Sequence, residues 1–376
     1  MVETRHRTTA WTLAWLCVLV TAYASLYPFD DWRNQDIPPW SFVTAPWPKY
    51  LTAFDLWSNF LGYLPLGFWL CLAALRSGSS RWGSVGLALA LALLLSLAME
   101  SLQSFLPARV PSQVDGLCNL GGAATGALLA AELERRGWLY HWAQFRHKGL
   151  AKDASGSLVL MVLWPLALLF PSAVPLGLGH VLERLRANLL QDFPAWLWLQ
   201  QLPPDGFFQT LSPRMELLCV ALGLWVPALL GLGALRGMVQ RLTWVGLVLV
   251  VAVVFNALSA ALSYGPEHAW FWIKPEVFAG LSVGFCLSVW SIKLSERWNL
   301  GLLLAAQLFL LLWLNQLHAS VYLEQTVQTW EQGRFIRFHG LTQWLSWLWP
   351  WAVVLWALVG MWRLAWRPKA TPKIAA

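Results

Sequence analysis

Three pairs of polar residues stand at helical spacing inside or beside long apolar runs. The pairs are Asp55 with Asn59, Glu100 with Gln103, and Asp115 with Asn119. Residues three or four apart lie on one face of an α-helix, so each pair places a carboxyl group beside an amide. A charge at bilayer depth costs about 2.5 to 3.5 kcal/mol on insertion scales, so such groups usually face a protein interior or a cavity and often mark function.

One basic residue, Arg109, lies in the short segment between the second and third pairs. We expect three neighbouring helices to direct these groups to one region of the outer leaflet, where carboxylates outnumber the single cation. Such a region could hold a polar ligand through charged groups and amides. Alternatively, the groups only bond helix to helix, for about 0.6 kcal/mol each. The ligand-binding candidates are Asp55, Asn59, Glu100, Gln103, Arg109, Asp115 and Asn119.

The segments that carry these residues are too apolar for a soluble protein. Hydrophobic residues make up 58% of the 376 positions and charged residues only 12%. A bilayer span needs about 20 apolar residues, and its backbone groups must bond within the segment. The sequence therefore predicts an all-α, polytopic membrane bundle with about ten transmembrane helices. We place these near residues 10–28, 56–75, 83–106, 116–133, 157–178, 215–235, 242–264, 270–292, 299–317 and 341–363.

The distribution of basic residues predicts the orientation. If the N-terminus is cytoplasmic, 17 of the 26 Lys and Arg residues fall on cytoplasmic segments, as the positive-inside rule requires. We therefore expect both termini in the cytoplasm and a place in the bacterial inner membrane. The first run also resembles a signal peptide, but we favour an uncleaved span. Outer segments 180–213 and 318–340 suit interfacial helices.

A basic cytoplasmic loop over residues 136–156 divides the chain. We expect a four-helix membrane domain over residues 10–135 and a six-helix membrane region over residues 157–366. Weaker polar candidates in the second part are Asn256, Lys274, Glu276, Asn315, His318, Arg334, Arg337 and His339. A histidine at a span end is usually a wetted interfacial residue.

Several other functions find little support. Gly280, Ser282 and Gly284 match a G-x-S-x-G string, but Ser282 lies mid-helix, so helix packing explains the string better. No phosphate-binding loop or zinc motif is present, and we predict no metal, no cofactor and no nucleic-acid partner. Whether the protein is an enzyme stays open, and the sequence leans against it. The five cysteines show no C-x-x-C pair and are expected to be structural.

Together, the three polar pairs, Pro65, Gly67 and Arg109 resemble the signature of the VanZ-like family. The resemblance extends to the Tyr27-Pro28-Phe29 stretch and to Gly122 and Gly126, which also form a small-xxx-small pattern for close helix packing. It covers residues 10–135 and implies four core helices. The family is named for a component associated with teicoplanin resistance, and most members have no known biochemical activity. The additional spans set this chain apart from short members.

Three functions follow as hypotheses. The first is an envelope protein whose outer-leaflet pocket binds membrane lipids or a lipid-linked cell-wall precursor. The second is a secondary transporter, suggested by the number of spans and the intramembrane carboxylates, although no inverted repeat is visible. The third is a membrane enzyme in which Glu100 acts as a general acid or base on a lipid-linked substrate.

Overall fold

The structure is a computed structural model, and it describes most of the chain. The described residues are 9–27, 29, 31–48, 52–107, 109–138, 149–150, 154–182, 185–186, 189–190, 193, 196, 211–317 and 336–366. The chain divides into two compact units, Met1–Phe145 and Arg146–Ala376. Both units are built from helices, and the described residues outside them add only one isolated bridge, between Leu150 and Leu235.

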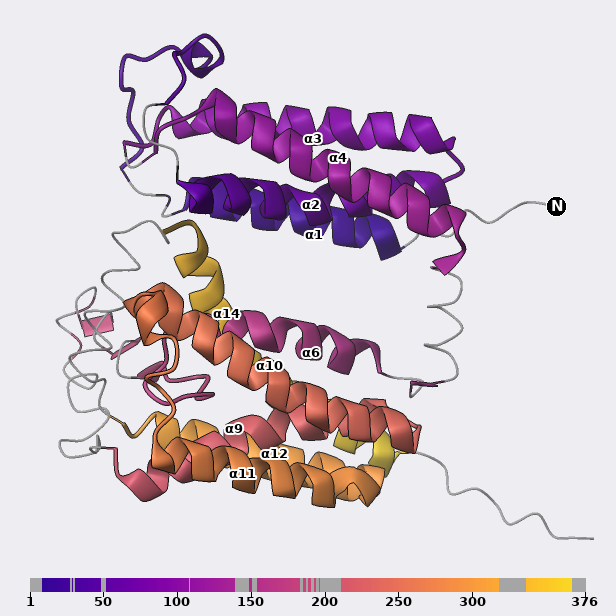
Figure 1. The fold of residues 1–376 in the computed structure, drawn as a ribbon, viewed down its shortest axis with the longest axis vertical. Helices are drawn as coiled ribbons and strands as arrows, with labels where there is room; N and C mark the ends of the chain where they lie inside the picture. The colour runs from indigo at the N-terminus through magenta and orange to yellow at the C-terminus, as the bar shows by residue number, and fades with distance from the viewer. Residues whose placement is uncertain are drawn as a thin grey trace, which may run out of the picture. The chain divides into compact units, whose positions relative to one another are not determined.

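The N-terminal unit is a bundle of four helices that lie side by side (Figure 1). Its elements are α1 (Thr9–Leu26), the short 3-10 helix η1 (Ser41–Val43), α2 (Ala53–Arg76), α3 (Arg81–Gln103) and α4 (Gln113–Arg135). A hydroxyl side chain fixes the start of α2, α3 and α4. Thr52, Ser80 and Ser112 each accept a hydrogen bond from a backbone N–H in the following turn, which satisfies a donor that the helix leaves unpaired.

Helices α2 and α4 approach each other more closely than residues with side chains allow. A Cβ atom added at Gly122 would overlap the carbonyl oxygen of Phe60, and one at Gly126 would overlap that of Leu64. On the opposite helix, Gly67 faces the backbone of Ala123 in the same way. The expected close approach of the fourth helix through Gly122 and Gly126 is therefore confirmed, and its partner is α2.

The C-terminal unit surrounds one central helix. Its elements are α6 (Ser155–Ala167), α9 (Pro213–Ala234), α10 (Met238–Tyr264), η2 (Pro266–His268), α11 (Pro275–Trp290), η3 (Ser291–Lys293), α12 (Glu296–Leu314) and α14 (Ile336–Ala365). Helix α9 packs against α6, α10, α11 and α12, and most of its side chains are buried. On α11, Gly280 and Gly284 face the backbone of α9, because added Cβ atoms would lie 2.7 and 2.6 Å from the carbonyl oxygens of Leu217 and Ala221.

The helix predicted over residues 157–178 is shorter than expected. Helix α6 ends at Ala167, and the chain continues as irregular backbone through residues 168–181. Pro171 explains the end, because it has no N–H to donate to the carbonyl oxygen of Ala167 and disfavours helical conformation in Phe170 before it. The irregular segment is nevertheless deeply buried, with Val174 at 0% and Leu176 at 1% exposure.

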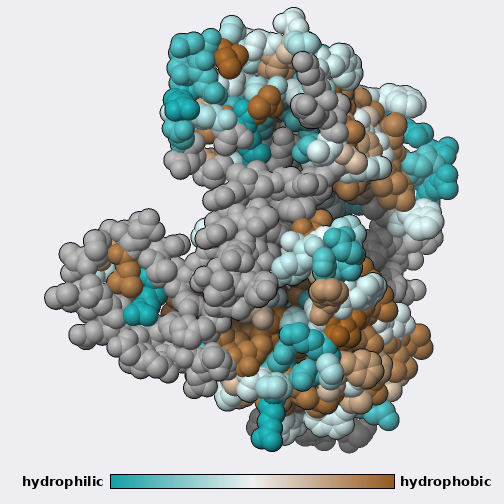
Figure 2. Space-filling view, turned by 60° about the vertical axis from the view of Figure 1, so that its left-hand side comes forward, coloured by the Kyte–Doolittle hydropathy of each residue, from teal (hydrophilic) through white to brown (hydrophobic). Residues whose placement is uncertain are grey.

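The fold class is confirmed as an all-α, polytopic membrane protein. Among the described residues, eight helices are long and apolar enough to cross a membrane, and α1 and α6 are shorter apolar helices. Figure 2 shows brown hydrophobic residues over large parts of the visible surface and teal hydrophilic residues gathered in separate patches. Large apolar side chains such as Leu94, Val250 and Leu355 are exposed on the helices, which suits contact with lipid. The interfacial helices expected over residues 180–213 and 318–340 fall mostly outside the described residues.

Candidate functional site

The candidate residues lie at the end of the N-terminal unit where α1 and α3 finish and α2 and α4 begin. This is the end that the charge distribution predicts to be outside. Glu100, Gln103, Arg109, Asp115 and Asn119 are all buried there, between 3% and 6% exposed. Asp55 and Asn59 are only half-buried. Burial of two carboxyl groups and a guanidinium in one small bundle is unusual, because Asp, Glu and Arg are mostly exposed in proteins. Buried charges also cost free energy unless they are paired or hydrogen-bonded.

Glu100 and Gln103 join the end of α3 to the segments around it. A Glu100 oxygen (Oε2) accepts a hydrogen bond of 2.8 Å from the backbone N–H of Ser112. The Gln103 side chain donates from Nε2 to the carbonyl oxygen of Ser25, at 3.0 Å. Both residues therefore stabilise local backbone, one at the start of α4 and the other at the end of α1.

Arg109 closes the C-terminal end of α1. Its Nη2 donates to the carbonyl oxygen of Tyr27 at 2.5 Å and to that of Ala24 at 3.4 Å. The last carbonyls of a helix have no partner within the helix, and a cation beside them is favoured by the helix dipole. The geometry therefore gives Arg109 a positioning role that the sequence did not predict.

Asn119 connects α4 to α3. Its Nδ2 donates to the hydroxyl of Ser96 at 2.9 Å, and both side chains are buried. Asp115 lies one turn earlier, in the first turn of α4, where a helix dipole stabilises a negative charge. These two residues confirm that the pair shares one inward face of its helix.

Asp55 has a different environment from the other carboxyl groups. Its Oδ2 accepts a hydrogen bond of 2.6 Å from the hydroxyl of Thr52, while its backbone N–H donates to the same hydroxyl at 3.2 Å. This reciprocal pair belongs to the N-terminal cap of α2. The structure therefore assigns Asp55 a capping contact.

Two buried residues near Glu100 were missed by the sequence analysis. Tyr63 is 3% exposed, and its hydroxyl lies near Ser96 and Glu100 but has no hydrogen-bond partner among the described residues. A sequence signal for both existed, because Tyr63 follows Asn59 by four residues and Ser96 precedes Glu100 by four. Two of the three polar pairs thus continue for one more turn along the same helix face.

Two amide oxygens in this region have no hydrogen-bond partner among the described residues. They are Oε1 of Gln103 and Oδ1 of Asn119, and both atoms are buried. An unpaired buried polar atom costs about 1 to 3 kcal/mol, so native proteins usually supply a partner, often water or a ligand. We call Tyr63, Ser96, Glu100, Gln103 and Asn119 the outer cluster. It combines one carboxyl group with two amide oxygens and the Tyr63 hydroxyl, and apart from the carboxyl group none of these has a hydrogen-bond partner among the described residues.

The segment between α1 and α2 lies over this end of the bundle. The backbone N–H of Arg33 donates to Phe105 at 3.0 Å, and Gln35 Nε2 donates to the carbonyl oxygen of Ser104 at 2.8 Å. On the other side, Gln113 Nε2 donates to the carbonyl oxygen of Ala45 at 2.7 Å. Residues 33–45 therefore cover the loop that carries Arg109.

The C-terminal unit has a cavity of its own at the predicted outer end. Its volume is about 570 Å³, and its walls come from the irregular segment after α6, from α9, α10 and η2, and from the start of α11. Glu216, Asn256 and Lys274 line it, with the aromatic side chains of Tyr264 and Trp272. Asn256 and Lys274, two of the weaker sequence candidates, therefore share one cavity.

Asn315, another weaker candidate, is a structural residue. Its Oδ1 accepts from the backbone N–H groups of Val181 and Leu182, and its Nδ2 donates to the carbonyl oxygens of Gly179 and Leu311. These bonds satisfy the irregular backbone, whose polar groups would otherwise be buried without partners. The side chains of His318, Arg334, Arg337 and His339 lie outside the described residues.

Ser282 of the G-x-S-x-G string is exposed on α11 and donates to the carbonyl oxygen of Phe278 at 2.9 Å. The glycines of the string pack against α9, as the sequence analysis expected of helix packing.

Comparison with known proteins identifies the N-terminal unit. Residues 4–134 match the family model VanZ/LLP1, and no family model matches the rest of the chain. The suspected VanZ-like resemblance of the N-terminal region is therefore confirmed. No curated protein and no solved structure matches the chain.

Proposed function

We propose that the VanZ-like domain of this multi-pass membrane protein binds the polar part of a lipid-linked or cell-wall component at the outer leaflet, through the outer cluster. One observation carries the proposal. Two buried acceptor oxygens, on Gln103 and Asn119, have no hydrogen-bond partner among the described residues, and the buried carboxyl group of Glu100 lies in the same cluster. A bilayer interior offers little water to satisfy such atoms, so a ligand that brings its own donors would be stabilised there.

The chemistry of the outer cluster favours a ligand rich in hydrogen-bond donors. Amide oxygens and a carboxylate accept hydrogen bonds, so hydroxyl, amine or amide N–H groups are their natural partners. Sugar and peptide moieties of lipid-linked envelope components carry many such groups. We expect Arg109 to act indirectly, because its bonds to the end of α1 position the segments around the cluster.

The test is native mass spectrometry of the full chain extracted in native lipid particles. Glu100→Gln keeps an oxygen that can accept from Ser112 but removes the charge, so the fold should persist. The matched control is Glu134→Gln, on the exposed opposite end of α4. We expect a co-purifying lipid to be present in the wild type and in the control, and to be lost in Glu100→Gln. If all three proteins carry the same lipids in the same amounts, the cluster only bonds helix to helix and the proposal is wrong.

A role in the cell envelope can be tested separately. The family's association with glycopeptide resistance predicts that a strain producing the wild-type chain tolerates more teicoplanin than one producing Glu100→Gln at equal membrane abundance. Equal susceptibility of both strains would remove the resistance role without affecting the lipid result.

Transport is the second candidate function, and the C-terminal unit supports it. The helix interrupted at Ala167 is followed by irregular backbone that lines the outer cavity together with Glu216. Interrupted helices beside a polar cavity are typical of transporter substrate sites. The sequence analysis predicted a continuous span over residues 157–178 and therefore missed this interruption.

Alternating access would expose the cavity to both membrane faces in turn. We expect a cysteine at Ser263, whose buried hydroxyl has no hydrogen-bond partner among the described residues, to react with a small impermeant maleimide added to either face of sealed vesicles. A chain without the native cysteines serves as background. Reaction from one face only would argue for a static cavity and against transport.

A further inference from the structure

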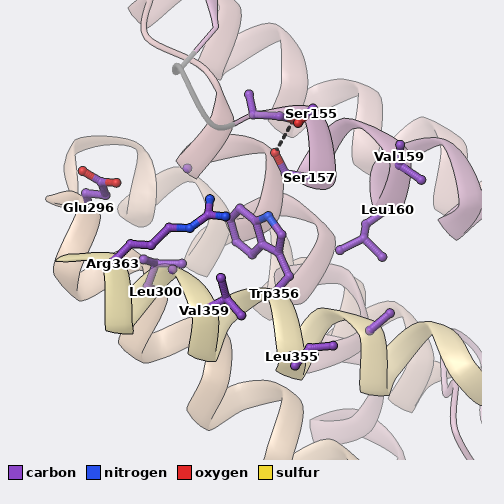
Figure 3. A pocket seen from close by; sticks show the side chains of 15 residues that line it. Ser155, Ser157, Val159, Leu160, Glu296, Leu300, Leu355, Trp356, Val359 and Arg363 are labelled. Carbon is purple, nitrogen blue, oxygen red and sulfur yellow. Dashed lines mark hydrogen bonds between the residues drawn. The ribbon is translucent and has the colours of Figure 1, made fainter. Parts of the chain in front are cut away.

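A second cavity lies at the opposite, predicted cytoplasmic end of the C-terminal unit. It has a volume of about 530 Å³ and lies between α6, α9, α12 and α14. Figure 3 shows its walls: α6 carries Ser155 and Leu160, α14 carries Leu355 and Trp356, and Arg363 extends along α14 towards the indole. All of these residues belong to one compact unit.

The polar and apolar groups of this cavity are arranged along the helix axes. Ser155, Glu296 and Arg363 stand at the helix ends, where α6 and α12 begin and α14 finishes. Leu160 on α6 and Leu355 on α14 line the part nearer the middle of the helices. Eight residues separate Arg363 from Leu355, which corresponds to about 12 Å at 1.5 Å per residue. The cavity is therefore polar at its membrane-surface end and apolar towards the bilayer interior.

Its polar end offers hydrogen-bond donors. The guanidinium of Arg363 points towards the indole of Trp356 (Figure 3). Among the described residues, neither Nε1 of Trp356 nor the hydroxyl of Ser155 forms a hydrogen bond. A guanidinium, an indole N–H and a hydroxyl together suit the oxygens of a phosphate group, and arginine binds phosphate strongly.

The indole reaches this place because its neighbour on α6 is a glycine. A Cβ atom at Gly156 would lie 2.9 Å from Cδ1 of Trp356 and 3.0 Å from its Nε1. At Gly233 an added Cβ would still lie 3.9 Å from the ring. The position of the indole donor therefore depends on a missing side chain at Gly156.

We propose that this cavity binds a glycerophospholipid of the cytoplasmic leaflet. The phosphate lies at Arg363, Trp356 and Ser155, and one acyl chain lies against Leu160, Leu355 and Val359. The polar-to-apolar order of the cavity is the order of phosphate and acyl chain in a lipid of that leaflet, where basic side chains meet lipid phosphates. Glu296 lines the same end, so the headgroup beyond the phosphate carries a donor, as ethanolamine and glycerol do.

The site is independent of the outer cluster, which belongs to the other unit. Its test uses the purified full chain in detergent micelles, titrated with dioleoyl phosphatidylethanolamine or dioleoyl phosphatidylglycerol and observed by native mass spectrometry. Dioleoylglycerol, with the same chains and no phosphate, separates the phosphate contact from simple apolar contact, and glycerol phosphate separates a lipid from a free phosphate.

Arg363→Gln should lower the affinity for both phospholipids about tenfold, equivalent to 1.4 kcal/mol. The matched control Arg297→Gln, exposed at the same predicted end but outside the cavity, should bind like the wild type. Trp356→Phe keeps an aromatic ring and removes the N–H donor, so it should weaken binding roughly threefold, less than the loss of a charged contact. Dioleoylglycerol and glycerol phosphate should both bind the wild type weakly.

Three results would overturn the proposal. One is equal binding by Arg363→Gln and Arg297→Gln. The others are dioleoylglycerol binding as tightly as the phospholipids, which would leave only an apolar groove, and glycerol phosphate binding as tightly, which would leave only an anion site. Circular dichroism and the elution volume of each variant show that a loss of binding does not reflect a loss of fold.

Discussion

The contact between α2 and α4 gives the sharpest prediction about the VanZ-like domain, because two neighbouring glycines of one helix face different surroundings. A Cβ atom at Gly126 would overlap the backbone oxygen of Leu64. A Cβ atom at Gly121 would lie 3.7 Å from the ring of Phe60, an ordinary contact. Gly126→Ala and Gly121→Ala therefore make the same chemical change on the same helix, and only the first forces α2 and α4 apart.

The expected magnitudes follow from two opposing effects. Alanine favours a helix over glycine by about 1 kcal/mol, which should raise the stability of Gly121→Ala. Overpacking costs about 1 to 3 kcal/mol, and the upper end applies at Gly126 because a backbone oxygen cannot rotate away. The net change for Gly126→Ala is then a loss of about 2 kcal/mol. At about 2 to 4 °C per kcal/mol for a domain of this size, the unfolding midpoint should fall by roughly 4 to 8 °C.

Differential scanning fluorimetry of the full chain in one detergent, at one scan rate, measures both variants. Gly121→Ala should unfold at the wild-type temperature or up to about 4 °C above it. The reasoning would be refuted if Gly126→Ala were as stable as Gly121→Ala, because α2 and α4 would then have room between them. Gly62→Ala makes the same change on α2, the helix that faces Gly126, where no described atom lies within 4 Å of the added Cβ. It therefore controls for the effect of a glycine-to-alanine change on α2 without a clash.

Three further predictions test other parts of the chain. Asn315→Leu should lower the free energy of unfolding by about 3 kcal/mol or more, because it leaves several buried backbone groups without partners. Asn299→Leu removes only one bond to a carbonyl oxygen and should cost less. Equal denaturant midpoints of the two variants would contradict this. In intact cells, a cysteine at Thr44 should react with impermeant maleimide and one at Ser79 should not, and the reverse pattern would invert the predicted orientation. Ser282→Ala should leave thermal stability and lipid content unchanged, and a large change in either would reopen a functional role.

Much of the candidate site followed from residue spacing alone. The cost of a charge in a bilayer and the helical period together predicted that Glu100, Gln103, Asp115 and Asn119 face inward, and these side chains are buried. The small-residue pattern on α4 predicted a close helix contact. Both inferences depend on local sequence and on the membrane as solvent, which are available without any tertiary information.

The role of Arg109 could not be predicted from the local sequence. Its contacts with Tyr27 and Ala24 join residues more than 80 positions apart, and no local pattern encodes them. The same holds for Asp55, whose position on the helix face suggested a ligand contact but whose short side chain reaches the hydroxyl of Thr52 first. A carboxyl group in the first turn of a helix is often a cap, and this alternative competes with every functional interpretation of such a residue.

The shortened helix α6 shows a second limit of sequence analysis. Residues 157–178 are apolar throughout, and hydropathy does not distinguish a helix from irregular backbone that is buried inside a bundle. Such backbone persists at membrane depth only where protein groups satisfy it. Here Asn315, at the end of α12, and Ser259, on α10, supply those groups. The structure of one segment therefore depends on residues about 90 to 140 positions away.

Arg109 and Asn315 lead to one criterion for separating structure from function in this protein. Both are polar, both lie at or beside membrane depth, and both direct their hydrogen bonds to backbone groups where a helix ends or the chain is irregular. Polarity at depth is therefore insufficient evidence for a ligand site. What points to a ligand in the outer cluster is a combination: Gln103 Oε1 and Asn119 Oδ1 have no hydrogen-bond partner among the described residues, and the buried carboxyl group of Glu100 belongs to the same cluster. Asn119→Leu tests this criterion. If it neither removed a co-purifying ligand nor lowered the free energy of unfolding, Asn119 Oδ1 would bind no partner. The structural interpretation would then extend to the whole cluster.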